Sequence, residues 1–182
     1  MADGFLYRAI GVIHSAHKDI SQGPVQPCYA EGCTGTVEVF PEFMEGLRDL
    51  EGYSHIYLLY HCHKAKPSPL LVKPFIQDTK RGLFSTRVPG RPNPIGMSIV
   101  RLISCKGCVL HVGSIDVLDE TPLLDIKPYS HRIDCVEDTR DGWQGEVDDC
   151  TAHLLGRRVR ECPAYTLLYQ FSPKDTGKSK VK

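Results

Sequence analysis

The residues best suited to chemistry lie in one proline-rich stretch, residues 87–96 (RVPGRPNPIG). Each of its three prolines fixes its own φ at about −65° and pushes the preceding residue towards an extended conformation. The stretch therefore predicts a stiff loop, which presents Arg87, Arg91 and Asn93 with little entropy left to lose when a ligand binds. A purely structural turn between two strands is the alternative for a loop of this composition.

Acidic side chains recur among apolar ones in residues 116–129 (DVLDETPLLDIKPY). A solvated acidic loop fits poorly, because Val117 and Leu118 would be exposed with it. Carboxylates in apolar surroundings need a partner cation or a hydrogen-bonded role, and Lys127 and the loop arginines are available. Together with Tyr129, these groups suit a ligand that carries both charges. A zwitterionic amino-acid moiety is one such ligand, and a sulfonium centre also favours nearby anions.

Cysteine spacing raises the question of a metal site. Cys105 and Cys108 have the spacing of a zinc knuckle, and Cys28 with Cys33 could supply two more ligands. Apolar runs flank residues 106–107 on both sides, so a hairpin turn with the two cysteines as neighbours across it is favoured instead. A disulfide framework is not expected, because a cytoplasmic chain keeps its thiols reduced.

Length and composition limit the kinds of protein that this chain can be. The 182 residues predict one domain, and the 41% hydrophobic and 24% charged content is ordinary for a globular protein. The formal net charge is zero, so the chain as a whole does not indicate nucleic-acid binding, although a local basic patch remains compatible with it. No apolar run reaches the roughly 20 residues of a membrane span, and the N-terminus lacks the regions of a signal peptide. A cytoplasmic protein is expected.

The chain must position these groups with strands for the most part. Strands are expected over residues 5–15, 34–40, 55–63, 97–104 and 109–117, with a further candidate at 165–171. One short helix over residues 41–50, with Gly52 as its C-cap, is expected to cover one end of the sheet. The fold class predicted is therefore mainly β: a single-sheet antiparallel β-barrel with a few short helices.

The predicted strand over residues 55–63 carries two histidines. Its period of two places His61 and His63 on one face and Cys62 on the other. Two histidines on one strand face could ligate a metal, but a structural role for both is favoured. No metal site is predicted.

Familiar nucleotide-binding motifs do not occur. There is no GxGxxG after a strand, no GxxxxGK[ST] loop and no GxSxG elbow. Neither a Rossmann site, nor a P-loop, nor a serine-hydrolase elbow is supported.

Three segments closely resemble the TrmO (TsaA-like) family: residues 82–87 (GLFSTR), 91–97 (RPNPIGM) and 116–129. The resemblance runs from about Ile10 to about Trp143. It implies an S-adenosylmethionine-dependent tRNA methyltransferase with a β-barrel core that acts as a homodimer. The implied methyl acceptor is N6 of threonylcarbamoylated adenosine beside the anticodon of a tRNA. By the same resemblance we expect a methyltransferase domain over residues 1–145, a C-terminal extension over 146–172 that packs on the barrel, and a disordered tail over 173–182.

The resemblance also implies site residues. The cofactor site is expected to draw on Pro24, Val25, Gln26, His63, Lys64, Arg87, Met97, Asp116, Val117, Leu118, Asp119 and Glu120. Asp125, Lys127 and Tyr129 are expected to be catalytic, with Asp125 or Tyr129 as a proton acceptor, and Arg91 and Asn93 to bind substrate. Val25 stands where the family has arginine, and Glu120 where it has glycine.

Two alternatives remain open at this point. One is a TrmO-like methyltransferase that acts on a small molecule other than tRNA, and the other is a non-catalytic nucleotide-binding scaffold. A clustered lysine and arginine surface near Arg87 and Lys127 would favour tRNA over a small molecule. Failure to bind S-adenosylmethionine would favour the scaffold.

Overall fold

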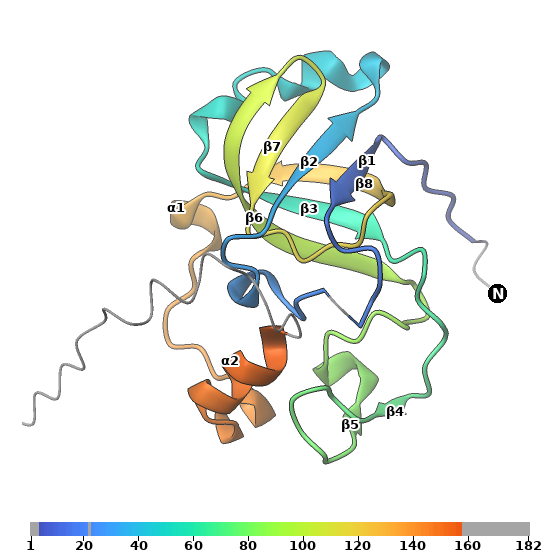
Figure 1. Cartoon of the computed structure of the whole chain (residues 1–182), viewed down its shortest axis with the longest axis vertical. Helices are drawn as coiled ribbons and strands as arrows, with labels where there is room; N and C mark the ends of the chain where they lie inside the picture. The colour runs from blue at the N-terminus through green and yellow to red at the C-terminus, as the bar shows by residue number, and fades with distance from the viewer. Residues whose placement is uncertain (1–3, 22, 158–182) are drawn as a thin grey trace, which may run out of the picture.

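The structure, a computed structural model that describes residues 4–21 and 23–157, is built around a closed antiparallel barrel (Figure 1). The strand order around the barrel is β1-β2-β7-β6-β3-β8. The strands are β1 (Gly11–Ser15), β2 (Thr34–Val39), β3 (His55–His61), β6 (Ile95–Lys106), β7 (Val109–Gly113) and β8 (Thr121–Pro128). Closure leaves no unpaired sheet edge, and the predicted fold class is confirmed.

Alternating apolar side chains fill the barrel. Ile13 on β1 lies opposite Val37 on β2, and Leu58 on β3 is fully buried. Val100 on β6 and Leu110 on β7 join the same core. The period-two pattern of the sequence therefore encodes the inner surface, because successive side chains of a strand point to opposite faces.

Two 3₁₀ segments cover one end of the barrel, at the top of Figure 1. They are η2 (Pro41–Leu47) and η3 (Leu50–Gly52), and Leu47 and Leu50 pack on the core as expected. The prediction of a single helix over 41–50 with Gly52 as its C-cap is wrong. Asp49 adopts a left-handed conformation with φ 66°, which interrupts the helical path, and Gly52 is the last residue of η3.

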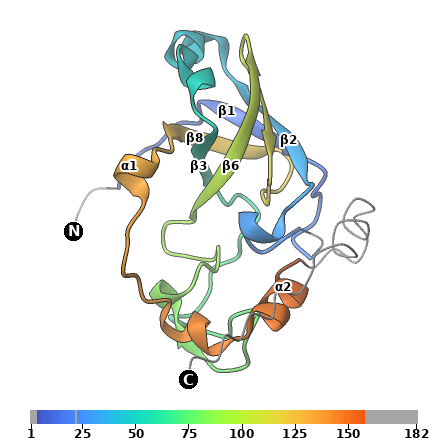
Figure 2. The ribbon, with the colours of Figure 1, turned by 90° about the vertical axis from the view of Figure 1, so that its left-hand side faces the viewer.

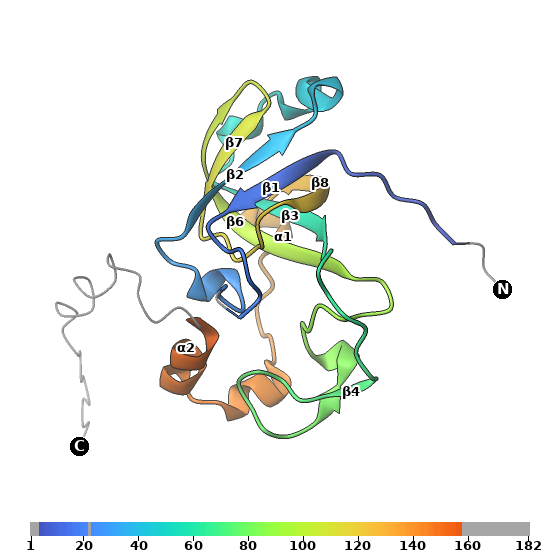
Figure 3. The ribbon, with the colours of Figure 1, turned by 45° about the vertical axis from the view of Figure 1, so that its right-hand side comes forward.

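Of the remaining elements, α1 (His131–Asp134) lies beside the barrel next to β8 and β3, and the others gather at the opposite end of the barrel (Figures 2 and 3). The others are η1 (Pro27–Tyr29), β4 (Leu71–Val72), β5 (Arg81–Gly82), η4 (Leu83–Ser85), η5 (Gly142–Glu146) and α2 (Asp149–Arg157). Helix α2 packs on η1. The rings of Tyr29 and His153 lie 5.9 Å apart, and the N–H of Val25 donates to the carbonyl of Gly156 at 2.8 Å.

Four strand predictions need correction. The strand predicted over 109–117 ends at Gly113. Only residues 11–15 of the first predicted strand are β, and residues 5–8 before them are exposed without a pairing partner in the sheet. Strand β3 ends at His61, so His63 lies in the loop beyond it. The β6–β7 turn is formed by Gly107, with φ 58°, and Cys108, because Lys106 pairs with Val109. The two cysteines of the CxxC pair are therefore not opposite each other.

Some expectations lie beyond the part described. The candidate strand over 165–171 and the tail over 173–182 fall outside the described residues, and the domain boundary at residue 145 stays a prediction. No helix within residues 4–21 and 23–157 has the length and apolar character needed to cross a membrane.

Candidate cofactor site

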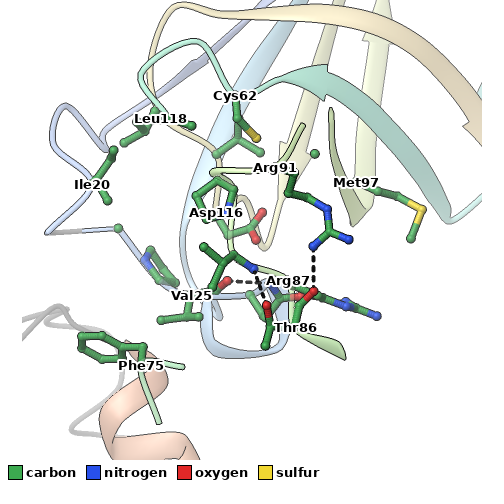
Figure 4. A pocket seen from close by; sticks show the side chains of 18 of the residues that line it. Ile20, Val25, Cys62, Phe75, Thr86, Arg87, Arg91, Met97, Asp116 and Leu118 are labelled. Carbon is green, nitrogen blue, oxygen red and sulfur yellow. Dashed lines mark hydrogen bonds between the residues drawn. The ribbon is translucent and has the colours of Figure 1, made fainter. Parts of the chain in front are cut away.

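A cavity of about 600 Å³ opens between the barrel and the elements at its lower end (Figure 4). Its wall comes from five parts of the chain: Ile20 with residues from 23–29, and residues from 60–65, 74–76, 86–97 and 116–121, with Trp143 and Gln144 at one side. This volume falls within the range of about 300–1,000 Å³ usual for small-molecule sites. Segments far apart in the sequence meet here because β3 and β7 end, and β6 begins, near this opening.

The proline-rich loop is held in shape by its own arginine. Nη1 of Arg91 donates to the carbonyls of Leu83, at 3.2 Å, and Thr86, at 2.8 Å. Its guanidinium also lies over the ring of Phe84, 5.4 Å from the centroid. Gly90 is required nearby, because a Cβ at this position would lie 2.2 Å from the carbonyl oxygen of Lys66. The loop is stiff, as expected, and Arg91 stabilises it from within.

Arg87 joins the loop to the segment before η1. Its Nη1 donates to Oε1 of Gln26 at 2.7 Å, and the side chain remains exposed. Both residues line the cavity, so a cation and an amide meet at its wall. A guanidinium in this position can bind a carboxylate of a ligand.

Asp116 is the single carboxyl-bearing residue among the described residues of the cavity wall. Its Oδ1 accepts a hydrogen bond from Oγ of Ser98 at 2.6 Å, and Oγ of Ser98 lies 3.0 Å from the hydroxyl of Tyr60. Burial raises the pKa of Asp116 to about 6, against the hydrogen bond from Ser98 and the charge of Arg87, which lower it. The carboxyl is therefore ionised near neutral pH, but only by a small margin.

His63 and Cys62 contribute two side chains to the same wall that are uncharged at pH 7. Nδ1 of His63 lies 3.3 Å from Oγ1 of the buried Thr121. Burial, Lys64 and His61 lower the pKa of His63, so its imidazole is neutral at pH 7. Burial also raises the pKa of the Cys62 thiol to about 11, so this thiol stays protonated.

Most of the predicted cofactor residues do line the cavity. They are Pro24, Val25, Gln26, His63, Lys64, Arg87, Met97, Asp116, Val117 and Leu118, and the predicted substrate residue Arg91 lies among them. Asp119, Glu120 and Asn93 are not part of the wall. Asp119 faces Lys18 and His14 and accepts from the N–H of Ser15 at 3.0 Å, so it ties the turn after β7 to the end of β1.

The predicted catalytic set lies elsewhere. Asp125, Lys127 and Tyr129 follow the outer side of β8 and do not line the cavity. Nζ of Lys127 lies 2.8 Å from Oδ2 of Asp125, and the ring of Tyr129 packs on that of Tyr57 at 5.8 Å. In this single chain the structure does not bring the three residues to the site.

Sequence reasoning missed Tyr60 and Ser98. One signal could have found Ser98: it occupies an inward position of β6, between apolar residues, and is 1% exposed. A buried hydroxyl at such a position needs a hydrogen-bond partner. Nothing in the sequence names that partner.

The wall suits S-adenosylmethionine. Arg87 can bind the carboxylate of its amino-acid part, Asp116 supplies an anion for a positively charged centre, and apolar side chains such as Val25 and Leu118 can cover the rest. A metal has no comparable support. No group of three or more His, Cys, Asp or Glu side chains within residues 4–21 and 23–157 is placed to hold one.

Comparison with known proteins decides the family. Residues 12–135 match the model of the tRNA-methyltransferase O N-terminal domain. The chain belongs to the TrmO family. The predicted family is thus confirmed, as are its enzyme class, S-adenosylmethionine-dependent methyltransferase, and its cofactor.

Several TrmO relatives show how far the likeness extends. A probable S-adenosyl-L-methionine-binding protein of Pyrococcus abyssi is 54% identical over 137 residues, which are 75% of this chain and 74% of the relative. The tRNA (adenine(37)-N6)-methyltransferase of Escherichia coli is 36% identical over 69% of this chain and 57% of its own length. A crystal structure of TrmO from Pseudomonas aeruginosa is 38% identical, with a TM-score of 0.65 over 77% of this chain and 62% of that one. The chain therefore spans less than two thirds of the last two proteins.

Proposed function

We propose that this TrmO-family chain methylates tRNA at N6 of a threonylcarbamoylated adenosine beside the anticodon, in the cytoplasm. The name of the Escherichia coli relative, a tRNA (adenine(37)-N6)-methyltransferase, supports an adenosine N6 acceptor. S-adenosylmethionine supplies the methyl group as an electrophilic carbon on a sulfonium. The residues of this chain then have to orient the acceptor nitrogen, exclude water and accept a proton.

One observation carries the choice of tRNA: one wall of the cavity belongs to a strongly basic segment. Residues 62–94 contain seven lysines and arginines and a single carboxylate, Asp78, which pairs with Lys73 at 2.7 Å. Five of the seven cations are exposed: Lys64, Lys66, Lys73, Lys80 and Arg87. The chain as a whole has zero formal net charge, so the cations are concentrated beside the site. Such a surface suits the phosphates of a polyanion and has no evident use for a small neutral acceptor.

Two measurements test this function: calorimetric titration with S-adenosylmethionine, and transfer of labelled methyl groups to tRNA that carries the threonylcarbamoyl group but lacks the N6-methyl group. We expect the cofactor to bind to the protein, and the label to enter the tRNA only when the protein is present. Lys66→Glu is expected to weaken tRNA binding several-fold and to lower the slope of affinity against salt by about one to two contacts, with cofactor affinity unchanged. Lys106→Glu, at the exposed end of β6 on the other end of the barrel, is the matched control.

The outcomes separate the candidate functions. A folded protein that does not bind the cofactor would favour a scaffold. Cofactor binding with no transfer to tRNA, and equal tRNA binding by the Lys66 and Lys106 variants, would favour a small-molecule acceptor.

We also propose a homodimer that forms through the outer face of β3 and β6. Ile95, Met97, Ile99 and Ile103 alternate along the outside of β6 and are 42%, 51%, 38% and 50% exposed. An outward strand face in water is normally polar, so this apolar row indicates a docking surface. Ile95 and Met97 also line the cavity, and Asp125 and Lys127 lie across β3 from the row. A second copy on this face would therefore flank the site.

Sedimentation of the wild type is expected to give twice the mass of one chain. Ile99→Glu is expected to give monomers, because Ile99 belongs to the face without lining the cavity. Met44→Glu, at an exposed apolar position on η2, serves as control and is expected to stay dimeric. A monomeric wild type, or a dimer that survives the Ile99 change, would contradict this face.

A further inference from the structure

The hydrogen bonds around Asp116 have a direction. The hydroxyl of Ser98 donates its one hydrogen to Oδ1 of Asp116, so it must accept the hydrogen of the Tyr60 hydroxyl. Tyr60 and Asp116 both line the cavity, and Ser98, which is 1% exposed, joins them from behind the wall. Ser98 therefore hydrogen-bonds to Oδ1 of Asp116 and not to Oδ2.

Gly96, the last residue of the proline-rich stretch, determines where the Tyr60 ring can lie. Tyr60 lies directly opposite Gly96 in the β3–β6 ladder. A Cβ on residue 96 would lie 2.1 Å from Cε2 of Tyr60, so only glycine leaves room for this ring. The last glycine of the proline-rich stretch therefore sets the start of the hydrogen-bonded chain.

We propose that Asp116 is the proton acceptor of the methyl transfer and that Ser98 and Tyr60 are its positioning residues. The inference rests on the proposed function. The acceptor nitrogen needs a base because, in a carbamoylated adenosine, its electron pair is delocalised into the carbonyl group and the purine ring. As this pair forms the new N–C bond, the electrons of the C–S bond remain on sulfur. The N–H proton passes to a carboxylate oxygen of Asp116, and from there to solvent.

Three other titratable side chains and one cation influence Asp116 from the elements around it. They are Tyr60 of β3, Cys62 just beyond it, Cys28 of η1 and Arg87 of the proline-rich loop. Burial raises the pKa of Tyr60, Cys62 and Cys28, so these three are neutral at pH 7. Arg87 remains charged and favours the carboxylate. Asp116 is thus the group of this cluster whose protonation state changes near neutral pH.

His63 is the competing base on the cavity wall. Its imidazole is neutral at pH 7, and one ring nitrogen faces Thr121 at 3.3 Å. Asp116 is preferred because its carboxylate is oriented by a fully buried partner, Ser98, whereas His63 lies in the loop after β3. An experiment can distinguish the two bases, because Ser98 hydrogen-bonds to Asp116 and a change at Ser98 should affect only that base.

The pH dependence of methyl transfer to tRNA is the first test. Asp116→Asn is expected to slow transfer by about 10²–10⁴-fold, well beyond the weaker cofactor binding that follows from removing the anion beside the sulfonium. Ser98→Ala removes the hydrogen bond that favours the carboxylate, so the acidic limb of the rate profile is expected to move to higher pH. Ser104→Ala, a serine further along β6, is the matched control and should leave the limb in place.

Titration of the free protein supplies a readout independent of activity. In protein labelled at aspartate carboxyl carbons, the NMR signal missing from Asp116→Asn identifies Asp116. Its midpoint is expected to coincide with the acidic limb and to rise in Ser98→Ala.

Three results would overturn the inference: loss of cofactor binding in Asp116→Asn in proportion to the lost rate, an acidic limb that disappears in His63→Asn, or an Asp116 midpoint unchanged in Ser98→Ala. If the wild type transfers nothing to tRNA, the proposed function fails on its own. The carboxyl titration then still decides whether Ser98 controls Asp116.

Discussion

Gly96→Ala is expected to destabilise the protein by about 1–3 kcal/mol, the usual cost of adding a methyl group where no space exists. The new Cβ would lie within 2.7 Å of three atoms of the Tyr60 ring, and the nearest would be 2.1 Å away. The ring must move, and its hydroxyl then loses Ser98. Denaturant unfolding measures the loss of stability, and the pH profile of methyl transfer measures the damage to the hydrogen-bonded chain.

Gly46→Ala is the control for this change. A Cβ at Gly46 would meet no atom within 4 Å, so the same substitution there lacks the clash. Equal stability losses at both positions would mean that the Tyr60 ring yields freely, and that Gly96 is not kept for steric reasons.

The fold followed from sequence to the extent that local patterns determine it. The alternation in residues 34–40 predicted β2 correctly, because one face of that strand is buried and the other wet. The apolar density of residues 55–63 predicted β3, but its end was missed because the chain turns after His61 without a glycine or proline at that point. Helical spacing over 41–50 was ambiguous, since intervals of three and four residues also fit consecutive 3₁₀ turns.

The site was less predictable, because it depends on strand register. Tyr60 reaches Ser98 only because β3 and β6 pair with Tyr60 opposite Gly96, and Ser98 reaches Asp116 only because β7 returns the chain to the same end of the barrel. No local pattern encodes contacts between residues 18 and 38 positions apart. Resemblance to the TrmO family located Asp116, and the geometry suggests a role for it.

The same dependence explains the placement of Asp125. Residues 116–129 form one continuous motif in the sequence. The strand β8 carries Asp125 away from the cavity along the barrel, and a register shift opposite Leu59 and Tyr60 turns its side chain outward beside Lys127. A catalytic role for Asp125 stays a prediction, because the single chain does not bring this residue to the cavity.

Asp116→Asn is expected to stabilise the protein, and by more at high pH than at low pH. Burial raises the pKa of Asp116 from 3.8 to about 6, so the folded state disfavours the ionised carboxyl. The contribution of such a carboxyl to the free energy of unfolding is most favourable below its pKa in the unfolded state. It is lost as the pH rises through its pKa in the folded state. By linkage the penalty reaches about 3 kcal/mol at pH 8 and shrinks as the pH falls through 6 towards 4.

Thermal unfolding of Asp116→Asn and wild type between pH 5 and pH 8 measures this difference. Asp78→Asn is a control of opposite sign, because the hydrogen bond from Lys73 lowers the pKa of Asp78 below 3.8, so that variant should lose stability by an amount that does not change between pH 5 and pH 8. A gap between Asp116→Asn and wild type that does not change with pH would show that the carboxyl titrates normally in the fold. A gap that widens with pH would mean that the protein retains a destabilising buried carboxylate, which a structural role alone does not explain and proton acceptance at the cavity wall does.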